Sequence, residues 1–363
     1  MSGNGDSGAH DVTPGRGRPE GRPQACASPL SAHYDAALLD LDGVVYLGGT
    51  PIPGAADALA RAAAGGMKLA YVTNNASRTP HAIAGQLVGM GVQATASDIV
   101  TSAQAAAHLL ADKLPAGAAV LVVGGAGLRQ AVRERGLRPV TASAAQPLAV
   151  VQGYAPDIDY GLLAEAALAL NAGAWYVLAN ADPTLPTPRG AQPGNGSLAQ
   201  VLIHATGVQP VVAGKPEPPL HAESVQRVGA KRPLVVGDRL DTDIEGAFRG
   251  GADSLLVLTG VTRPAELLLA PREHQPSYIA ADLAGLNASH PALEPANGGF
   301  RCGGWTAAAG TGEAWLGVTG TGDWIDALRA LCAAAWTAGP PPGSPEEQNR
   351  AAELVLAALP APR

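Results

Sequence analysis

Two aspartates, Asp40 and Asp42, come directly after the apolar residues 36–39 and are separated by a single leucine, with Gly43 behind them. If this segment forms a strand, both carboxylates point to the same face of it, because side chains alternate along a strand. Two like charges this close together cost free energy unless a positive group lies beside them. The motif therefore predicts either a structural turn capped by two aspartates or a site that holds a cation.

A calcium-binding EF-hand loop also begins with aspartates in this spacing. The fifth and twelfth positions of such a loop would fall on Val44 and Pro51, which carry no carboxylate. We therefore exclude an EF-hand.

Three later segments offer the partners that a cation and phosphate site needs, at residues 73–75 (TNN), 214–219 (GKPEPP) and 237–243 (GDRLDTD). Together with Asp40, Asp238 provides the hard oxygen ligands that suit Mg²⁺. Thr73, backbone N–H groups and Lys215 provide hydrogen-bond donors to phosphate oxygens. With the metal in place, one aspartate can attack phosphorus while the other transfers protons.

The elements that must position these residues are indicated by apolar runs that end abruptly in polar residues or glycine, at residues 36–43, 68–75, 233–243 and 254–260. Continuous rather than alternating apolarity is typical of strands that are buried on both faces. Alanine-rich segments that end in glycine pairs, typical of helices, follow the first and third runs. This alternation predicts a parallel α/β sheet, and ligands of such sheets bind beyond the carboxyl ends of the strands. The polar residues would meet there.

The chain outside this predicted core, which comprises residues 34–78 and 213–288, divides into three parts. Residues 79–212 have strand and helix patterns of their own, and an insert of this length predicts a separate domain. Residues 1–33 are rich in Gly, Pro, Ser and Arg without the apolar segment of a signal peptide, which predicts a disordered leader. Residues 289–363 become rich in Ala, Gly and Trp. They predict a small C-terminal extension, in which we find no catalytic constellation.

The composition limits the classes of partner. The chain has 363 residues, of which 47% are hydrophobic, and a formal net charge of −7. Negative charge argues against nucleic acid or an anionic membrane surface as the main partner, and no apolar window is long enough to span a bilayer. Three scattered cysteines fit neither a disulfide framework nor a cysteine metal site. We therefore expect a cytoplasmic protein that acts on a small molecule.

The motifs DLDGV at residues 40–44, TNN, GKP and GDRLDTD stand in the order of the loose motifs of haloacid dehalogenase-type (HAD) phosphohydrolases, and residues 34–288 resemble that superfamily. The long insert and the segment PGNGSL at residues 193–198 resemble the subgroup with a large class IIA α/β cap. That subgroup includes p-nitrophenyl phosphate, phosphoglycolate, glycerol 3-phosphate and pyridoxal phosphate phosphatases. The resemblance implies a Rossmann-like parallel-sheet core with an inserted α/β cap and a small C-terminal appendage.

The resemblance also implies roles for the acidic residues. Asp40 would be the nucleophile that forms an aspartyl-phosphate, and Asp42 would be the general acid and base. A Mg²⁺ ion would be held by the Asp40 carboxylate, the Asp42 backbone carbonyl and Asp238. Asp243 would support the metal-bound waters or Lys215.

The resemblance assigns phosphate binding to Thr73, Asn74 and Lys215, and it gives Lys215 the further role of balancing charge. A lysine taken in isolation would be interpreted as solvated, but Lys215 is flanked by Gly214 and Pro216 in a chain with few lysines, so we interpret it as functional. Asn75 either shapes the loop or touches the substrate, and we expect Asp241 to be solvated.

The family's specificity loop matches residues 182–190 (DPTLPTPRG), where Asp182, Leu185 and Arg189 are the candidate contacts. The loop has no aromatic ring to stack on a pyridine, which favours glycerol 3-phosphate or 2-phosphoglycolate over pyridoxal phosphate or a broad range of sugar phosphates. Arg189 either meets a substrate carboxylate or is solvated. The resemblance further implies a homodimer formed through the cap.

Other classes of function were weighed against this one. A nicotinamide dehydrogenase shares the parallel sheet, but its pyrophosphate would meet two carboxylates after the first strand. The glycines at 124–127 lack the full dinucleotide fingerprint, so we interpret them as a turn in the cap. For the C-terminal extension, a regulatory or interaction module stays open. Residues 301–306 (RCGGWT) also distantly resemble an acyl-CoA pyrophosphate loop.

Overall fold

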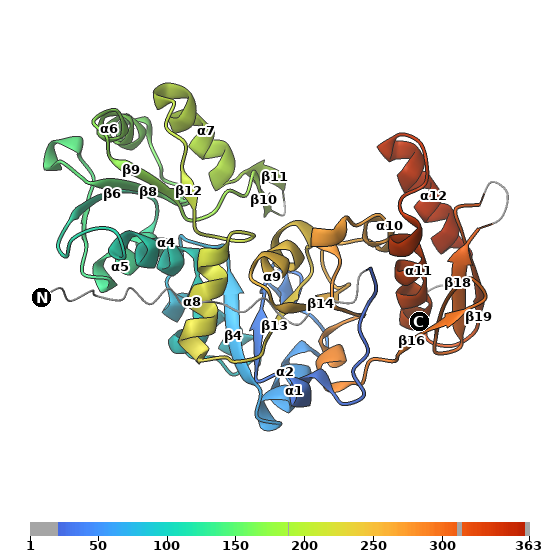
Figure 1. Ribbon diagram of the computed structural model, residues 1–363. Helices are drawn as coiled ribbons and strands as arrows, with labels where there is room; N and C mark the ends of the chain where they lie inside the picture. Colours follow the sequence, from blue (N-terminus) through green and yellow to red (C-terminus); the bar gives the residue numbers. More distant parts are fainter. Residues whose placement is uncertain (1–20, 188, 311–313, 360–363) are drawn as a thin grey trace, which may run out of the picture.

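The computed structural model describes residues 21–187, 189–310 and 314–359. Three larger sheets follow one another in space, namely a central parallel sheet, a second parallel sheet above it and an antiparallel sheet at the other end of the molecule (Figure 1). The predicted α/β architecture with an inserted cap and a C-terminal appendage is confirmed.

The central sheet carries the predicted polar strand ends. Its six strands run in the order β15-β14-β13-β1-β4-β5, and every pairing is parallel. All four residues of β1 are buried, as continuous apolarity predicts. The strands span β1 Ala36–Leu39, β4 Lys68–Thr73, β5 Ile99–Thr101, β13 Pro233–Gly237, β14 Asp253–Val257 and β15 Tyr278–Ala280.

Helices flank both faces of the central sheet and connect its strands, as right-handed parallel crossovers require. A short hairpin of β2 and β3 follows β1 directly, and a single π-helical turn, η3, follows β13. These elements are α1 Leu30–His33, β2 Tyr46–Leu47, β3 Thr50–Pro51, α2 Ala55–Ala64, α3 Pro80–Gly89, α4 Ser102–Ala111, α8 Pro218–Val228, η3 Leu240–Ile244, α9 Glu245–Arg249 and α10 Pro264–Leu268.

The cap is built on the second parallel sheet, in the order β12-β9-β8-β6-β7, with a two-stranded hairpin, β10 and β11, at its edge. Figure 1 shows this sheet in green with α6 and α7 on its outer side. Its elements are β6 Ala119–Val123, α5 Ala126–Glu134, β7 Arg138–Val140, β8 Ala149–Gln152, α6 Tyr160–Asn171, β9 Trp175–Leu178, β10 Thr184–Thr187, β11 Gly190–Pro193, α7 Asn195–Thr206 and β12 Val211–Val212. The turn at residues 124–127 leads from β6 into α5, within the cap.

The predicted start of the cap at residue 79 is wrong. Helix α3 and strand β5 follow that position, and β5 pairs with β4 in the central sheet over Tyr71↔Ile99 to Thr73↔Thr101. The strand is only three residues long, so its apolar signal is too short to be separated from the helices around it. The cap sheet itself begins with β6.

The disordered-leader prediction is also wrong for residues 21–33. Cys26 forms a β-bridge with His290, the backbone N–H of Gln24 donates to the Ser277 carbonyl over 2.7 Å, and Leu30 is fully buried. Leu30 helps to dock this polar segment, because burying a leucine side chain stabilises the docked state by about 1.5–3 kcal/mol. Residues 1–20 lie outside the described residues.

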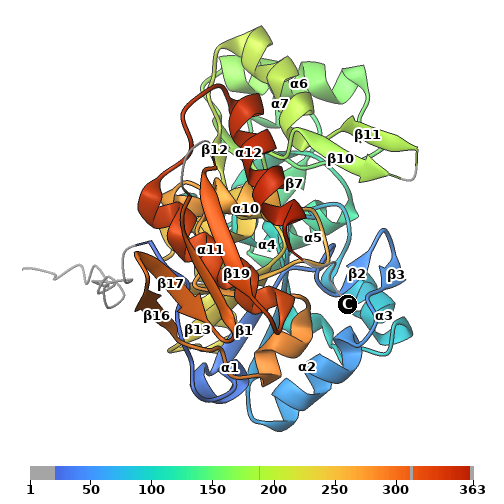
Figure 2. The ribbon, with the colours of Figure 1, turned by 90° about the vertical axis from the view of Figure 1, so that its right-hand side faces the viewer.

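The C-terminal extension forms an antiparallel meander against which α11 packs (Figure 2). Its core is continuous with the central domain, because Ile279 of β15 belongs to the same hydrophobic cluster. The Arg329 guanidinium donates to the Ile279 carbonyl over 2.7 Å, and the Trp336 indole donates to the Leu267 carbonyl over 2.9 Å. The elements are β16 Leu293–Ala296, β17 Gly299–Cys302, β18 Trp305–Ala309, β19 Leu316–Gly320, α11 Trp324–Ala338 and α12 Pro345–Ala357.

No helix within the described ranges is both long enough and apolar enough to cross a membrane.

Candidate active site

Asp40 lies at the carboxyl end of β1, where its backbone N–H donates to the Val236 carbonyl of β13 over 2.8 Å. The chain turns away at Gly43, which has a φ of 86°. A Cβ at this position would lie 2.3 Å from a carboxylate oxygen of Asp238. Glycine is therefore needed both for the left-handed backbone and for the close approach of the two loops.

Lys215 joins the nucleophile candidate to the acidic segment after β13. Its ammonium donates to Asp40 over 2.5 Å, to Asp243 over 2.8 Å and to the Val72 carbonyl over 3.1 Å. The Asp243 side chain is 1% exposed and that of Lys215 is 12% exposed, so these charges interact with little screening by water. Asn74 fixes the lysine backbone, because its side-chain oxygen accepts from the Lys215 N–H over 2.8 Å. A solvated lysine is ruled out.

The side chains of Asp40, Asp238 and Asp243 form a cluster in which one carboxylate oxygen from each lies within 4.8 Å of the others. Asp238 is fully buried. One of its oxygens accepts the Val261 N–H over 2.7 Å, and the other has no hydrogen-bond partner in the described part of the chain. A buried carboxylate oxygen without a partner, set among two further carboxylates, fits a hard divalent cation with oxygen ligands.

Glycines allow the loops to close around this cluster. A Cβ on Gly260 would lie 1.9 Å from the Asp238 carboxylate, and one on Gly237 would lie 2.2 Å from the Asp243 side chain. Both positions therefore require glycine, and the loop after β14 packs directly on Asp238.

The crowding of carboxylates shifts their pKa values in the absence of a cation. Burial raises the pKa of Asp40 to about 7 against the lowering effect of Lys215, and repulsion from Asp243 and Asp238 adds to the increase. Burial and Asp243 likewise raise the pKa of Asp238 to about 6. For Lys215, burial favours the neutral form, but Asp243 and Asp40 outweigh it and raise the pKa. A bound divalent cation would act on the carboxyl groups in the opposite direction.

Asp42 and Thr73 line the same pocket as this cluster. The Asp42 side chain is exposed at the pocket, and burial of part of it raises its pKa although the Gly48 N–H opposes this. The Thr73 hydroxyl accepts the N–H of Asn75 over 3.1 Å. The Asn75 side-chain oxygen accepts the N–H of Ser77 over 3.1 Å. Asn75 therefore shapes the loop, which was one of the two explanations that the sequence left open.

The cap contributes a smaller share of the pocket. Asp182 accepts from the Asn74 amide over 3.1 Å, and burial raises its pKa against the effect of that hydrogen bond. Leu185 of β10 also lines the pocket, which has a volume of about 240 Å³. Arg189 is exposed near the end of the hairpin and does not line this pocket. The structure therefore brings together every predicted site residue of the core, and two of the three from the cap.

The pocket residues that were not found from the sequence include Arg239, Tyr46 and Tyr154. Arg239 lies beside the acidic cluster and pairs with Asp241 through two hydrogen bonds, of 3.0 and 2.8 Å. Asp241 is therefore paired rather than merely solvated. Tyr46 and Tyr154 add aromatic rings to the pocket, so the absence of an aromatic residue in the cap loop does not leave the pocket without one. For these residues the sequence offers one indication, the spacing of Arg239 and Asp241 within residues 237–243, and this spacing alone only weakly predicts an ion pair.

Three family models match the chain. A haloacid dehalogenase-like hydrolase model matches residues 37–138, a HAD-hydrolase-like model matches residues 212–286, and a GCN5-related N-acetyltransferase-like model matches residues 302–359. The C-terminal extension thus resembles an acetyltransferase domain. The segment 301–306 that suggested this, however, forms the turn between β17 and β18 and does not begin a helix.

Curated relatives and solved structures agree with the first two models. A D-glycerol 3-phosphate phosphatase of Mycobacterium tuberculosis is 44% identical over 85% of this chain and 88% of its own length. The 5'-nucleotidase YutF of Bacillus subtilis is 39% identical over 63% and 89%. The crystal structure of a glycerol phosphate phosphatase from Mycobacterium tuberculosis in complex with magnesium has a TM-score of 0.80 at 42% identity, and covers 92% of this chain and 99% of that one.

The first relative is 44% identical over most of both chains, which shows family membership. The chain belongs to the haloacid dehalogenase-like hydrolase family, as a phosphoric monoester hydrolase with a class IIA cap.

Proposed function

We propose that the chain is a Mg²⁺-dependent phosphatase that hydrolyses small phosphate monoesters through an aspartyl-phosphate, and that glycerol 3-phosphate is its preferred substrate. The observation that carries this proposal is the Lys215 ammonium between Asp40 and Asp243, beside the unpartnered oxygen of Asp238. This arrangement offers a nucleophile, a fixed positive charge and a cation site in one pocket. The magnesium complex of the related phosphatase supports the choice of metal.

In this proposal, a carboxylate oxygen of Asp40 attacks phosphorus and the bond to the leaving oxygen breaks. Asp42 gives its proton to the leaving alkoxide, for which its raised pKa is suited. Asp42 then takes a proton from the water that attacks phosphorus and releases Asp40. Lys215 neutralises charge on Asp40 and on the phosphoryl oxygens throughout.

Thr73 and Asn74 bind the phosphoryl oxygens in this scheme. A Mg²⁺ ion held by Asp40, Asp238 and the backbone carbonyl of Asp42, with Asp243 in support, would supply positive charge that offsets the repulsion between the carboxylates and the phosphate.

The pocket favours a small and neutral leaving group. Its volume of about 240 Å³ is below the roughly 300–1,000 Å³ that is typical of drug-sized ligands. Asp182 presents a carboxylate to the part of the substrate beyond the phosphate, where it would accept hydroxyl hydrogens and repel a second carboxylate. This supports glycerol 3-phosphate over 2-phosphoglycolate. The 44% identical relative is named a D-glycerol 3-phosphate phosphatase, which also supports this choice of substrate.

A panel of substrates tests the proposal. We expect kcat/KM for glycerol 3-phosphate to exceed the values for 2-phosphoglycolate, pyridoxal phosphate and sugar phosphates by about tenfold or more, because a buried polar contact discriminates by at least this factor. EDTA should abolish turnover, and added Mg²⁺ should restore it. A higher kcat/KM for any other member of the panel would contradict glycerol 3-phosphate as the preferred substrate. Turnover in the presence of EDTA would contradict the dependence on Mg²⁺.

We further propose that the enzyme acts in the cytoplasm as a dimer formed through its cap. The free, buried cysteines Cys26, Cys302 and Cys332 fit a reducing compartment. On the cap, Tyr160 is 84% exposed and Leu168 of α6 is 57% exposed, which leaves an apolar surface for a second copy. Light scattering after size-exclusion chromatography should give twice the monomer mass, and the L168E variant should give the monomer mass.

A further inference from the structure

Arg239 brings a positive charge into the catalytic pocket that the proposed mechanism does not use. It lies just after β13 and immediately before η3, and it lines the pocket together with Asp182 of the cap. Its side chain is 36% exposed. A molecule bound in the pocket can therefore reach the guanidinium.

Asp241 holds this guanidinium in a fixed orientation. Its carboxylate accepts from Nε of Arg239 over 3.0 Å and from Nη2 over 2.8 Å. These bonds use two of the five guanidinium N–H groups, and the others donate to no acceptor among the described residues. Because the group is planar and held at one edge, its free donors are already oriented before a ligand arrives.

The charges of Arg239 and Asp182 interact across the pocket. The hydrogen bonds to Asp241 raise the pKa of Arg239, and the charge of Asp182 adds to the increase. Burial raises the pKa of Asp182, whereas the hydrogen bond from Asn74 and the charge of Arg239 oppose this. The two side chains form no ion pair in the described part of the chain, which leaves room for a ligand group between them.

This end of the pocket suits neutral hydroxyl groups. Arg239 contributes one positive charge, and Asp241 and Asp182 contribute two negative charges, so the group as a whole does not favour an anion. A carboxylate only accepts hydrogen bonds and a guanidinium only donates them, whereas a hydroxyl does both. Two neighbouring hydroxyls can each donate to Asp182 and accept from Arg239. The pair therefore matches a vicinal diol.

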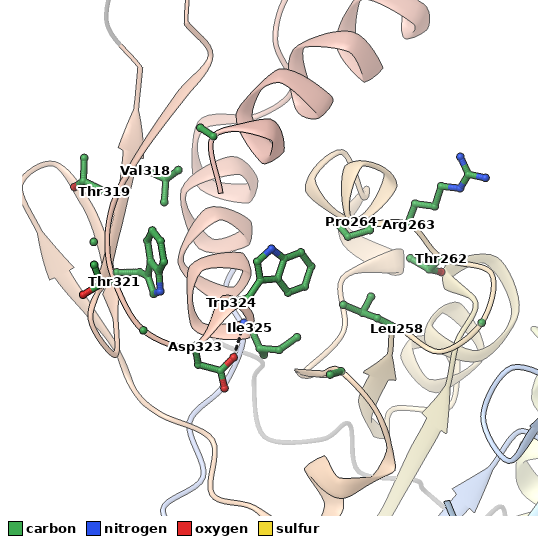
Figure 3. A pocket seen from close by; sticks show the side chains of 16 residues that line it. Leu258, Thr262, Arg263, Pro264, Val318, Thr319, Thr321, Asp323, Trp324 and Ile325 are labelled. Atoms are coloured by element: carbon green, nitrogen blue, oxygen red, sulfur yellow. Dashed lines mark hydrogen bonds between the residues drawn. The ribbon is translucent and has the colours of Figure 1, made fainter. Parts of the chain in front are cut away.

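A larger cavity, of about 1350 Å³, lies between the C-terminal extension and the loop after β14, beside Trp305 and Trp324 (Figure 3). No described residue lines both this cavity and the catalytic pocket, because Val261 of the loop faces the pocket while its neighbours face the cavity. Arg263 stands on the cavity side of the loop (Figure 3). The leaving group of a bound substrate is therefore recognised by the side chains of the smaller pocket alone.

We propose that Arg239 is a specificity-determining residue that, together with Asp182, selects phosphate monoesters whose leaving group carries a vicinal diol. The inference rests on the proposed function, because it names the part of glycerol 3-phosphate that the same pocket recognises. Arg239 comes from the core but acts on the leaving group, as the cap residues do. Asp241 is the residue that positions it.

Analogues that lack hydroxyls test the recognition of the diol in the unchanged protein. 2-Hydroxypropyl phosphate and 3-hydroxypropyl phosphate each lack one hydroxyl of glycerol 3-phosphate, and propyl phosphate lacks both. We expect kcat/KM at saturating Mg²⁺ to fall about tenfold or more when either hydroxyl is removed, because the polar side chains are then left unpaired. Equal values for glycerol 3-phosphate and the three analogues would overturn the proposal.

Substitution of Arg239 tests its share in this selection. R239Q removes the charge and the planar fork, so the ratio of kcat/KM for glycerol 3-phosphate to kcat/KM for propyl phosphate should fall about tenfold. R239K keeps the charge without the fork and should lower the ratio less. The matched control is R263Q, which removes an exposed arginine that lines only the larger cavity and should leave the ratio unchanged.

The ratio separates selection of the leaving group from a general structural effect, because both substrates share the phosphoryl group. The same ratio in R239Q and in the unchanged protein would overturn the proposal, whether or not overall activity falls. So would a higher Mg²⁺ requirement in R239Q with an unchanged ratio, which would assign Arg239 to the acidic cluster. If the unchanged protein hydrolysed none of these monoesters, the proposed function itself would fail.

Two further variants test the contacts that the proposal assigns. D241N should lower the ratio by a smaller factor than R239Q, because an asparagine has one oxygen to accept from the guanidinium where the carboxylate has two. The double variant D182N/R239Q should lose less than the product of the two single losses, because both side chains contact the same hydroxyls. Losses that multiply fully would overturn this shared contact.

Discussion

The core side and the cap side of the catalytic pocket differ in how firmly their side chains are held. On the core side, Lys215, Asp238 and Asp243 are largely or fully buried, and Lys215 alone makes three hydrogen bonds. On the cap side, Asp182 has a hydrogen bond to Asn74, and Arg189 lies exposed outside the pocket. Buried charges in fixed positions act on the phosphoryl group that all substrates share. In the proposed mechanism, the cap contacts the leaving group, which is the part that differs between substrates.

The difference leads to distinct expectations for variants. A change on the core side should lower turnover of every substrate by a similar and large factor. A change on the cap side should have a smaller effect that depends on the substrate, because it alters contacts with the leaving group alone.

The largest effect is expected for D40N, which removes the proposed nucleophile. We expect kcat to fall by on the order of 10⁴-fold for glycerol 3-phosphate and p-nitrophenyl phosphate alike. D57N, on the exposed side of α2, is the matched control and should keep full activity. If D40N retained a tenth of the activity on either substrate, Asp40 would lose its role, and with it the contrast between core and cap.

G260A should give the next largest effect. Its added Cβ would lie 1.9 Å from the Asp238 carboxylate, so the loop or the carboxylate must move. We expect the Mg²⁺ concentration for half-maximal activity to rise about 10- to 100-fold for all substrates, as is typical when groups that orient a metal ligand are disturbed. G85A, in a helix with open space around the new Cβ, should leave that concentration unchanged. An unaltered Mg²⁺ requirement in G260A would show that this loop does not position Asp238.

The pH dependence of stability should show the strain among the core carboxylates. The pKa values of Asp40 and Asp238 are raised to about 7 and about 6 in the metal-free fold. Between about pH 4 and pH 7 these two carboxyl groups bind more protons in the folded state than in the unfolded state, so their contribution to the free energy of unfolding falls as pH rises. His290, whose pKa burial lowers to about 4, contributes in the opposite direction.

We expect the melting temperature of the metal-free protein to decline over that window, and Mg²⁺ to reduce the decline. D40N should also reduce it, because the variant lacks one of the titrating groups. A melting temperature that depends on pH in the same way in D40N and in the unchanged protein would contradict the raised pKa of Asp40. The cap variant D182N should keep most of the decline.

D182N should have a smaller effect on activity, and one that depends on the substrate. The amide can still accept from Asn74 but no longer carries a charge, so we expect kcat/KM to fall about five- to tenfold for glycerol 3-phosphate and to rise for 2-phosphoglycolate. R189A is the control on the same cap hairpin and should change either value by less than about twofold. If D182N lowered kcat/KM for both substrates by the same factor, Asp182 would act on the shared phosphoryl group, as the core residues do.

The sequence predicted the core of the site more completely than the rest because each core residue stands at a strand end. Asp40, Thr73 and Asp238 follow continuous apolar runs, and the topology of a parallel sheet brings such ends together. Strand β5 was missed because three buried residues carry too little periodicity. The docking of residues 21–33 was missed because it depends on contacts with Ser277 and His290, far along the chain.

The pocket residues that were missed show the same limit. Tyr46 and Tyr154 enter from a hairpin and a cap loop, and only the packing of cap on core places both rings in one pocket. The cavity beside Trp305 likewise joins residues of β18 to a loop some 40 positions earlier in the sequence, which no local pattern connects.

The most direct test of the division of roles between Asp40 and Asp42 is a rapid-quench reaction of D42N with p-nitrophenyl phosphate. This leaving group needs no proton, whereas hydrolysis of the aspartyl-phosphate needs the base. We expect a burst of p-nitrophenolate that approaches one per chain, and mass spectrometry should find the phosphate on Asp40. Release of p-nitrophenolate without any phosphate on Asp40 would contradict the mechanism.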